Sequence, residues 1–517
     1  MSEFLLGAAP VGLGFVMAAS RRGTTVALAP EARDRVVAAR RVVERYAQGD
    51  APIYGLNTGL GGNVAFRLDK AQIEAFQVQM VRGRCIGMGE PFPEATARAM
   101  GLCRLIGLAQ GGSGISPPVL DTMVAMFNAG LTPVIPGRGS IGAGDLGLCA
   151  HLGAAVIGLG EIFVNGEKRS AMEALTSAGL QPATLAAKDG LAILNASAVS
   201  CGHAAKVLAE LSDILFASVA IAGLTDEGYA ANPQIFDARL AAARPAGGQE
   251  RAAAMFRAVL AGSYLHDEGA ARSIQDALSF RVLAQIYGPA LTSFETAVES
   301  VETEINAAAD NPLVMTDDDL ILSTANFQTP AIALAFDTMA IVNTHLATAS
   351  AYRTIKMMNH HLSGLPKYLS PIGGASNGYN SLQKTASYLH GEIRLKAAPA
   401  SCDALPVSES VEDHAPQTAL TIRKLEEQLV PLRMLFAIEA VVAAQAVDIG
   451  KRPRLAPATG VLYEAIRASV PMLVEDRETG LDAMKALAVI AQPSFVAALR
   501  EAMPADAAGA FALSRKG

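Results

Sequence analysis

The residues of this chain that could do chemistry lie in glycine-rich loops and short polar motifs. One loop, at 139–151, reads Gly-Ser-Ile-Gly-Ala-Gly-Asp-Leu-Gly-Leu-Cys-Ala-His. A second, at 54–61, reads Tyr-Gly-Leu-Asn-Thr-Gly-Leu-Gly. Phenols titrate at about pH 10, so a phenol needs nearby positive charge or hydrogen bonds to act as a base at neutral pH. A third motif, Gln-Asp-Ala-Leu-Ser-Phe-Arg at 275–281, ends in an arginine whose planar guanidinium can pair with a carboxylate.

Together these motifs resemble those of the histidine/aromatic amino acid ammonia-lyase family. In that family an Ala-Ser-Gly tripeptide before Asp-Leu cyclises into an electrophilic methylidene-imidazolone. Here Ala143 is followed directly by Gly144 and Asp145, with no serine between them. Glycine permits ring closure because it lacks Cβ, but the exocyclic methylene arises when the serine loses water. The family therefore implies this cofactor, and the sequence predicts that it does not form.

Three explanations of the short loop remain open. The written sequence represents a modified tripeptide imperfectly, a deletion has inactivated the elimination, or the protein does different chemistry in the same cavity. Leu278 stands where the family has a catalytic tyrosine, so a second group is missing as well. The joint loss favours the last two explanations.

The resemblance assigns roles to residues throughout the chain. It implies that Tyr54 is the base for the substrate β-proton. It also implies that Asn195 contacts the prosthetic group or the substrate amine, and that Arg281 binds the substrate carboxylate. Glu412, in a Val-Glu-Asp-His segment, would approach the site from another subunit. The remaining predicted site residues are Ala143 and Gly144 of the loop and the substrate-binding Gln275, Gln285 and Phe327.

Arg84 is the predicted specificity residue. By spacing it aligns with the family's side-chain selectivity position, where histidine and tyrosine lyases carry His and phenylalanine lyases an apolar residue. An arginine there indicates a substrate tail with negative charge or a strong acceptor. The alternative is a surface or intersubunit salt bridge, since Arg82 lies two residues away.

The composition argues against several classes of protein. Of the 517 residues, 51% are hydrophobic and 18% charged, enough apolar material for a large core. A net charge of −7 without a long basic run argues against a nucleic-acid partner. The first residues lack the pattern of a signal peptide, and five cysteines without a Cys-x-x-Cys pair indicate a reducing cytoplasm. The His pair at 360–361 lacks ligand spacing, so no metal site is predicted.

Long helices must position these residues. Apolar residues at spacings of three and four between 291 and 305 form one stripe, and further helices are predicted at 206–223, 330–358 and 418–448. Pro431 should kink or divide the last of these. The apolar run at 214–224 is too short to span a bilayer and predicts a buried helix, and no membrane partner is expected. The fold class is therefore mainly all-α.

Two domains are predicted. Residues 1–195 form a glycine-rich N-terminal domain that carries both loops, and residues 196–517 form a bundle of long helices with C-terminal helices. The tail at 504–517 is small and polar and is expected to be loosely ordered. The resemblance and the Ala-rich helices also imply a homotetramer whose active sites each draw on three chains.

Three functional hypotheses follow from these observations. The first is an ammonia-lyase-type enzyme, or a related aminomutase, acting on an amino acid with a polar or acidic side chain. The second is a lyase, isomerase or hydrolase that works without the methylidene-imidazolone on a carboxylate-bearing substrate. The third is a catalytically silent homologue. Measuring the intact mass would separate the first from the others.

Overall fold

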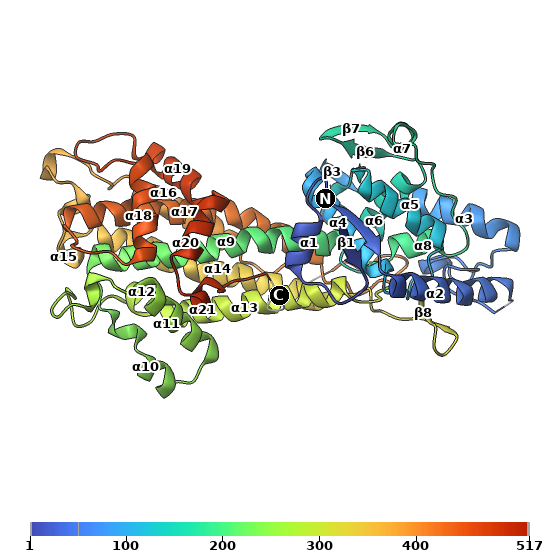
Figure 1. Ribbon diagram of the computed structural model, residues 1–517, viewed down its shortest axis with the longest axis horizontal. Coiled ribbons are helices and arrows are strands. Elements are labelled where there is room, and N and C mark those ends of the chain that lie inside the picture. Colours follow the sequence, from blue (N-terminus) through green and yellow to red (C-terminus); the bar gives the residue numbers. More distant parts are fainter. Residues whose placement is uncertain (1–2, 50, 403, 514–517) are drawn as a thin grey trace.

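The computed structural model describes residues 3–49, 51–402 and 404–513. The molecule is elongated, with a glycine-rich region at one end, a bundle of long helices through the middle, and short helices at the other end (Figure 1). We call these the loop end and the far end. The first and last described segments, β1 (Glu3–Leu6) and α21 (Ala505–Ala508), both lie near the middle of the long axis.

The central bundle is built from four long helices. They are α9 (Ala198–Tyr229), α13 (Leu283–Ile305), α14 (Pro330–Met357) and α17 (Thr418–Ile449). Nearly every residue of α9 is buried, because this helix is apolar all round and is packed against α17, α14, α13 and α4 (Glu94–Leu108). The predicted apolar stripe of α13 is confirmed, since all of its members face the core.

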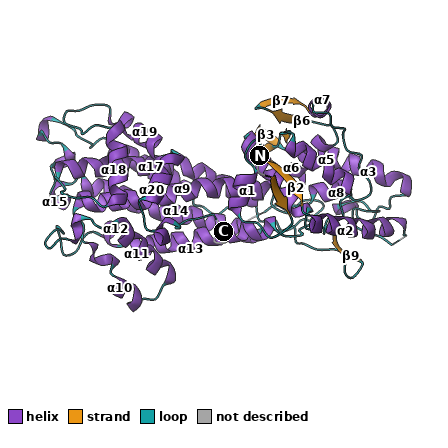
Figure 2. Cartoon of the chain, viewed as in Figure 1, coloured by secondary structure: helices purple, strands orange, loops and turns teal. Residues whose placement is uncertain are grey.

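The loop end consists of short helices and all of the described strands (Figure 2). Its other helices are α1 (Leu13–Ala19), α2 (Pro30–Gln48), α3 (Lys70–Gly83), α5 (Pro117–Asn128), α6 (Leu146–Val156), α7 (Ala171–Ser177) and α8 (Asp189–Leu194). Strands β1 (Glu3–Leu6) and β2 (Thr25–Leu28) pair in parallel. The antiparallel pairings are β3 (Met88–Pro91) with β5 (Pro136–Arg138), β4 (Thr132–Pro133) with β6 (Glu161–Val164), β6 with β7 (Glu167–Ser170), and β8 (Leu313–Met315) with β9 (Leu320–Leu322).

The remaining helices cover the bundle and the far end. They are α10 (Ala238–Ala243), α11 (Gly247–Val259), α12 (Leu278–Arg281), α15 (His360–Ser363), α16 (Leu382–Leu395), α18 (Pro457–Ser469), α19 (Thr479–Ile490), α20 (Pro493–Glu501) and α21 (Ala505–Ala508). The mainly helical fold class is confirmed.

Of three details of the sequence prediction, one is confirmed, one is wrong in part and one is wrong. The apolar run at 214–224 lies within the 32-residue helix α9 and is buried, as predicted. Pro431 does not divide α17, whose helix continues through it, and the kink stays a prediction. The third detail is the loosely ordered tail. The tail is helical at α21 and buries Phe511 beside Phe294, while residues 514–517 of the expected loose tail lie outside the described residues.

Three helical stretches are long and apolar enough to cross a membrane by length and composition. They are Asp189–Tyr229, α14 and α17, and 83%, 61% and 83% of their most apolar windows are buried inside the protein. Their apolar surfaces are therefore largely used in packing the bundle.

Candidate active site

The loop at 139–145 is held by Asp145, whose carboxylate is fully buried. It accepts hydrogen bonds from Ser140 Oγ at 2.6 Å, from Ser200 N at 2.7 Å and from Ser200 Oγ at 3.0 Å. Burial raises the pKa of Asp145, and these hydrogen bonds oppose that rise. The backbone N–H of Asp145 donates to Ala196 O at 2.9 Å, so the loop is fastened to the start of α9.

Gly144 brings the loop directly against Asn195. A Cβ on Gly144 would lie 2.9 Å from Asn195 Oδ1, and its φ of +64° is in the left-handed region that favours glycine. Its N–H donates to Phe327 O at 3.1 Å, and Ala143 forms an isolated antiparallel bridge with Gln328. The structure thus brings together Ala143, Gly144, Asn195 and Phe327.

The loop residues do not fit a methylidene-imidazolone. The side chain that would supply its methylene is absent between Ala143 and Gly144. The Gly144 amide is also engaged in an ordinary backbone hydrogen bond. We therefore derive no chemical step through that group.

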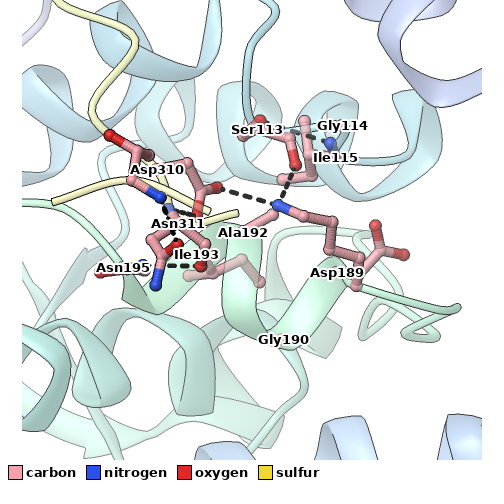
Figure 3. Close-up of polar contacts among 12 residues, drawn as sticks. Ser113, Gly114, Ile115, Asp189, Gly190, Ala192, Ile193, Asn195, Asp310 and Asn311 are labelled. Carbon is pink, nitrogen blue, oxygen red and sulfur yellow. Dashed lines mark hydrogen bonds and ion pairs between the residues drawn. The ribbon is translucent and has the colours of Figure 1, made fainter. Parts of the chain in front are cut away.

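Asn195 is fixed from behind by a buried ionic cluster, shown in Figure 3. Its Nδ2 donates to Asn311 O at 2.9 Å, and Asn311 N donates to the Asp310 carboxylate at 2.7 Å. Asp310 lies 3.4 Å from Lys188 Nζ and 4.0 Å from Arg104 Nη2, and all three charged side chains are at most 3% exposed. Two buried cations therefore share one carboxylate behind the loop.

The same cluster secures α8, the short helix that ends at Asn195. Lys188 Nζ donates to Ser113 O at 2.6 Å, and Arg104 donates to the carbonyls of Ala192 and Ile193. Desolvation lowers the pKa of Lys188, and the Asp310 charge opposes that shift. Sequence reasoning missed Lys188, Arg104 and Asp310 as supports. The sequence feature that could have indicated these supports is Lys188, a lysine within an otherwise apolar, buried segment.

Tyr54 lies on a loop packed against α8. Gly61 N donates to Tyr54 Oη at 3.1 Å. Gly55 has a φ of +65°, and a Cβ there would lie 2.4 Å from Leu191 Cδ2 of α8. The tyrosine loop and the Asn195 helix are therefore in direct contact.

Arg84, at the end of α3, is near enough to Tyr54 and Glu412 to interact with them electrostatically. Burial lowers the pKa of Arg84, while the negative charge that Tyr54 and Glu412 can carry opposes that shift. Ser408 Oγ donates to Glu412 Oε1 at 2.8 Å, and a Cβ on Gly61 would lie 3.8 Å from Ser408. Glu412 thus lies beside the tyrosine loop of its own chain, and its approach to a site of another subunit stays a prediction.

The other predicted residues lie at the far end of the molecule (Figure 1). Arg281 is on α12, and the 23-residue helix α13, roughly 35 Å long at 1.5 Å per residue, separates it from the loop end. Gln275 and Gln285 are exposed, and Arg281 is half-buried, with no hydrogen-bond partner for its Nε among the described residues. One chain therefore does not bring the carboxylate-binding set to Tyr54 and Asn195.

Comparisons with known proteins match this architecture. Residues 12–468 match the family described as aromatic amino acid lyase. The histidine ammonia-lyase of Symbiobacterium thermophilum is 39% identical over 495 residues, covering 94% of this chain and 96% of that relative. The crystal structure of the ergothioneine-degrading enzyme ergothionase from Treponema denticola, in complex with desmethyl-ergothioneine sulfonic acid, has a TM-score of 0.91 and 32% identity, covering 95% of this chain and 98% of that one. The histidine ammonia-lyase of Trypanosoma cruzi has a TM-score of 0.89 and 27% identity, covering 100% of this chain and 98% of that one.

Proposed function

The chain belongs to the aromatic amino acid lyase family and is a carbon–nitrogen lyase of the ammonia-lyase type, and we propose that its leaving group is a tertiary amine rather than ammonia. The family normally uses a methylidene-imidazolone to activate the amine. The observation that carries the proposal is the direct Ala143–Gly144–Asp145 junction, which lacks the serine for that group.

The leaving group follows from the chemistry of elimination without an electrophile. A base removes the β-proton, a carbon–carbon double bond forms, and the electrons of the Cα–N bond depart with nitrogen. A primary ammonium can lose an N–H proton to the base instead, and the resulting neutral amine leaves poorly. A quaternary trimethylammonium has no N–H proton, stays cationic, and departs as neutral trimethylamine.

The substrate tail is proposed to be a histidine-type ring. Histidine is named for two of the relatives, and ergothioneine, named for the Treponema enzyme, is a sulfur-substituted histidine whose nitrogen is trimethylated. The polar guanidinium of Arg84, beside Tyr54, suits ring nitrogen or sulfur acceptors better than an apolar ring. We therefore propose ergothioneine or the betaine of histidine as the substrate class.

We assign the residues as follows. Tyr54 takes the β-proton, and Arg84 contributes a positive charge near it. The side of the site next to the substrate Cα is formed by Asn195, Phe327 and the loop at Ala143 and Gly144. Glu412 borders the site on the side of Tyr54. The carboxylate is bound by the set at the far end of another copy, namely Arg281, Gln275 and Gln285.

This division of the site supports a homotetramer. The bundle also presents exposed apolar side chains along its outer helices, which suits burial between copies. They are Leu334, Ile341 and Tyr352 on α14, Tyr388 and Leu395 on α16, and Leu420 and Val430 on α17. Light scattering should give the mass of four chains, and a stable monomer would contradict the proposal. All five cysteines are free thiols, which suits the proposed cytoplasmic location.

A second candidate function is favoured by Arg84 alone. In it, ammonia is eliminated from an amino acid with a polar or acidic side chain. Incubation with ergothioneine, histidine betaine and histidine separates the two, with trimethylamine, ammonia and the conjugated product measured. We expect turnover of a betaine, none of histidine, and an intact mass without the loss of two waters. Ammonia release from histidine with that mass deficit would refute the main proposal.

A further inference from the structure

We infer that Arg353, held by Glu439, is a positioning residue for the carboxylate anchor Arg281. The inference rests on the role of Arg281 in the proposed function. Arg281 is on the four-residue helix α12, and its Nε is buried without a hydrogen-bond partner among the described residues. Its direction is therefore set largely by the backbone turn that presents it.

Arg353 reaches that turn from the core of the bundle. Its Nη1 donates to Ser279 O, two residues before Arg281, at 3.3 Å. Its other two nitrogens bind Glu439 in a forked pair, Nε to Oε1 at 2.6 Å and Nη2 to Oε2 at 3.0 Å. Both side chains are 1% exposed, so the pair is rigid and isolated from solvent.

The rest of the segment is fastened at two further points. Asn232 N donates to Asp276 Oδ2 at 2.8 Å, and the Phe280 ring stacks on Tyr229 at 4.0 Å between centroids. Both contacts tie the segment to the end of α9. Arg353 connects it instead to α14 and, through Glu439, to α17, so three bundle helices fix the placement of Arg281.

The charged groups around Arg353 favour its forked ion pair with Glu439. Asp226 is buried close to Arg353, Glu439 and Asp276, and burial raises its pKa well above the ordinary value; the Arg353 charge opposes that rise, and the carboxylates of Asp276 and Glu439 add to it. Its Oδ1 has no hydrogen-bond partner among the described residues. With its pKa raised, Asp226 competes less than Glu439 for the guanidinium, and the hydrogen bonds of Arg353 go to Glu439 and Ser279 O.

The test is a thermodynamic cycle that combines a substitution in the protein with the replacement of the ligand's carboxylate by an amide. Arg353→Lys keeps the charge but cannot serve both Glu439 and Ser279 O. Binding by calorimetry is compared for ergothioneine and its carboxamide, and for histidine and histidinamide, so that the readout does not depend on the leaving group. We expect Arg353→Lys to weaken binding of the carboxylates roughly tenfold to hundredfold and to leave binding of the amides nearly unchanged. In the double variant, Arg353→Lys should add little to the loss of carboxylate affinity that Arg281→Lys causes alone, because both substitutions act on the same contact.

The matched control is Arg98→Lys. Arg98 is another buried arginine, at the loop end, whose Nη1 and Nη2 donate to the carbonyls of Phe127 and Thr24. It should lower thermal stability without changing the ratio of carboxylate to amide affinity. If Arg353→Lys does not fold, Glu439→Gln, which loosens the fork but keeps its volume, should give the same selective loss at about threefold or more.

The outcomes are distinct. Equal weakening of carboxylates and amides by Arg353→Lys or Glu439→Gln would overturn the inference, because the pair would then be merely structural. If Arg281→Lys itself leaves carboxylate binding unchanged, the assignment of the anchor fails, and the inference falls with it. If the carboxylate cycle holds but no betaine is turned over, the leaving-group proposal fails and the positioning role stands.

Discussion

The loop end and the far end each hold a buried ionic cluster behind a predicted site residue, and the two clusters have opposite excess charge. Behind Asn195, the cations Lys188 and Arg104 share the single carboxylate of Asp310. Behind Arg281, Arg353 pairs with Glu439, and a second buried acidic group, Asp226, lies close by. In the first cluster Lys188 can lose its charge by releasing a proton, and in the second Asp226 can lose its charge by taking one up.

The difference suits the proposed chemistry at each end. Elimination places negative charge on the substrate carbon near Asn195, where excess buried cation is favourable. At the far end, a guanidinium must stay free for the substrate carboxylate. There Asp226 is a second acidic group close to Arg353, while the Nε of Arg281 has no hydrogen-bond partner among the described residues.

The largest expected effect comes from Tyr54→Phe. If the loop end does the proton transfer, kcat should fall by roughly 10²–10⁴-fold, because the base is lost while the ring still packs. The control is Tyr46→Phe, at the end of α2, whose hydroxyl donates to Asp319 O and lies outside the proposed site. A Tyr54→Phe enzyme with kcat near that of the parent would show that another group removes the proton.

The next largest effect compares the two clusters directly. Asp310→Asn leaves Lys188 and Arg104 as buried cations without their shared counterion, so we expect a loss of about 3–5 kcal/mol in the free energy of unfolding. Glu439→Gln should cost less, about 1–3 kcal/mol, because Asp226 can ionise and replace the lost charge. Chemical denaturation measures both.

A surface pair serves as the control for that comparison. Asp121 pairs with Arg33 where both side chains are about half exposed, and Asp121→Asn should change stability by less than about 1 kcal/mol. Equal losses for Asp310→Asn and Glu439→Gln would mean that Asp226 does not take over, and the contrast between the clusters would fail.

A smaller effect tests whether the two ends meet across subunits. Tyr54→Phe chains and Arg281→Met chains should each be nearly inactive as pure assemblies. Random co-assembly leaves about a quarter of the sites with an intact group from each chain, so co-expression should restore about a quarter of the parent activity. Activity no greater than the mean of the two pure variants would place both residues in a site within one chain.

The sequence predicted the loop end better than the far end. The structure brings Ala143, Asn195 and Phe327 together as the motifs predicted, and hydrogen bonds from a motif neighbour, Asp145, tie the loop to the start of α9. The position of Arg281 was not foreseen, because a motif does not show where in the fold its residues lie. The 23-residue helix α13 places Arg281 at the opposite end of the molecule. The supports Lys188 and Arg353 were missed because a charged letter in a sequence usually marks surface, and only packing shows it to be buried.

The smallest effect is a difference in how stability depends on pH. Asp226 has a raised pKa in the folded state, so the unfolded chain loses this proton near the ordinary value of 3.8 while the folded chain keeps it. Its contribution to stability is therefore complete below that value and is lost as pH rises towards the folded pKa. Lys188 behaves oppositely, since its lowered pKa makes stability rise with pH up to about its ordinary value of 10.5. Asp226→Asn should gain stability relative to the parent as pH rises above 4, by at most about 1.4 kcal/mol per pH unit. Lys188→Met should lose relative stability as pH rises towards 10, and denaturant midpoints at several pH values measure both. Parallel profiles for the two variants would show that the clusters do not differ in the sign of their buried excess charge.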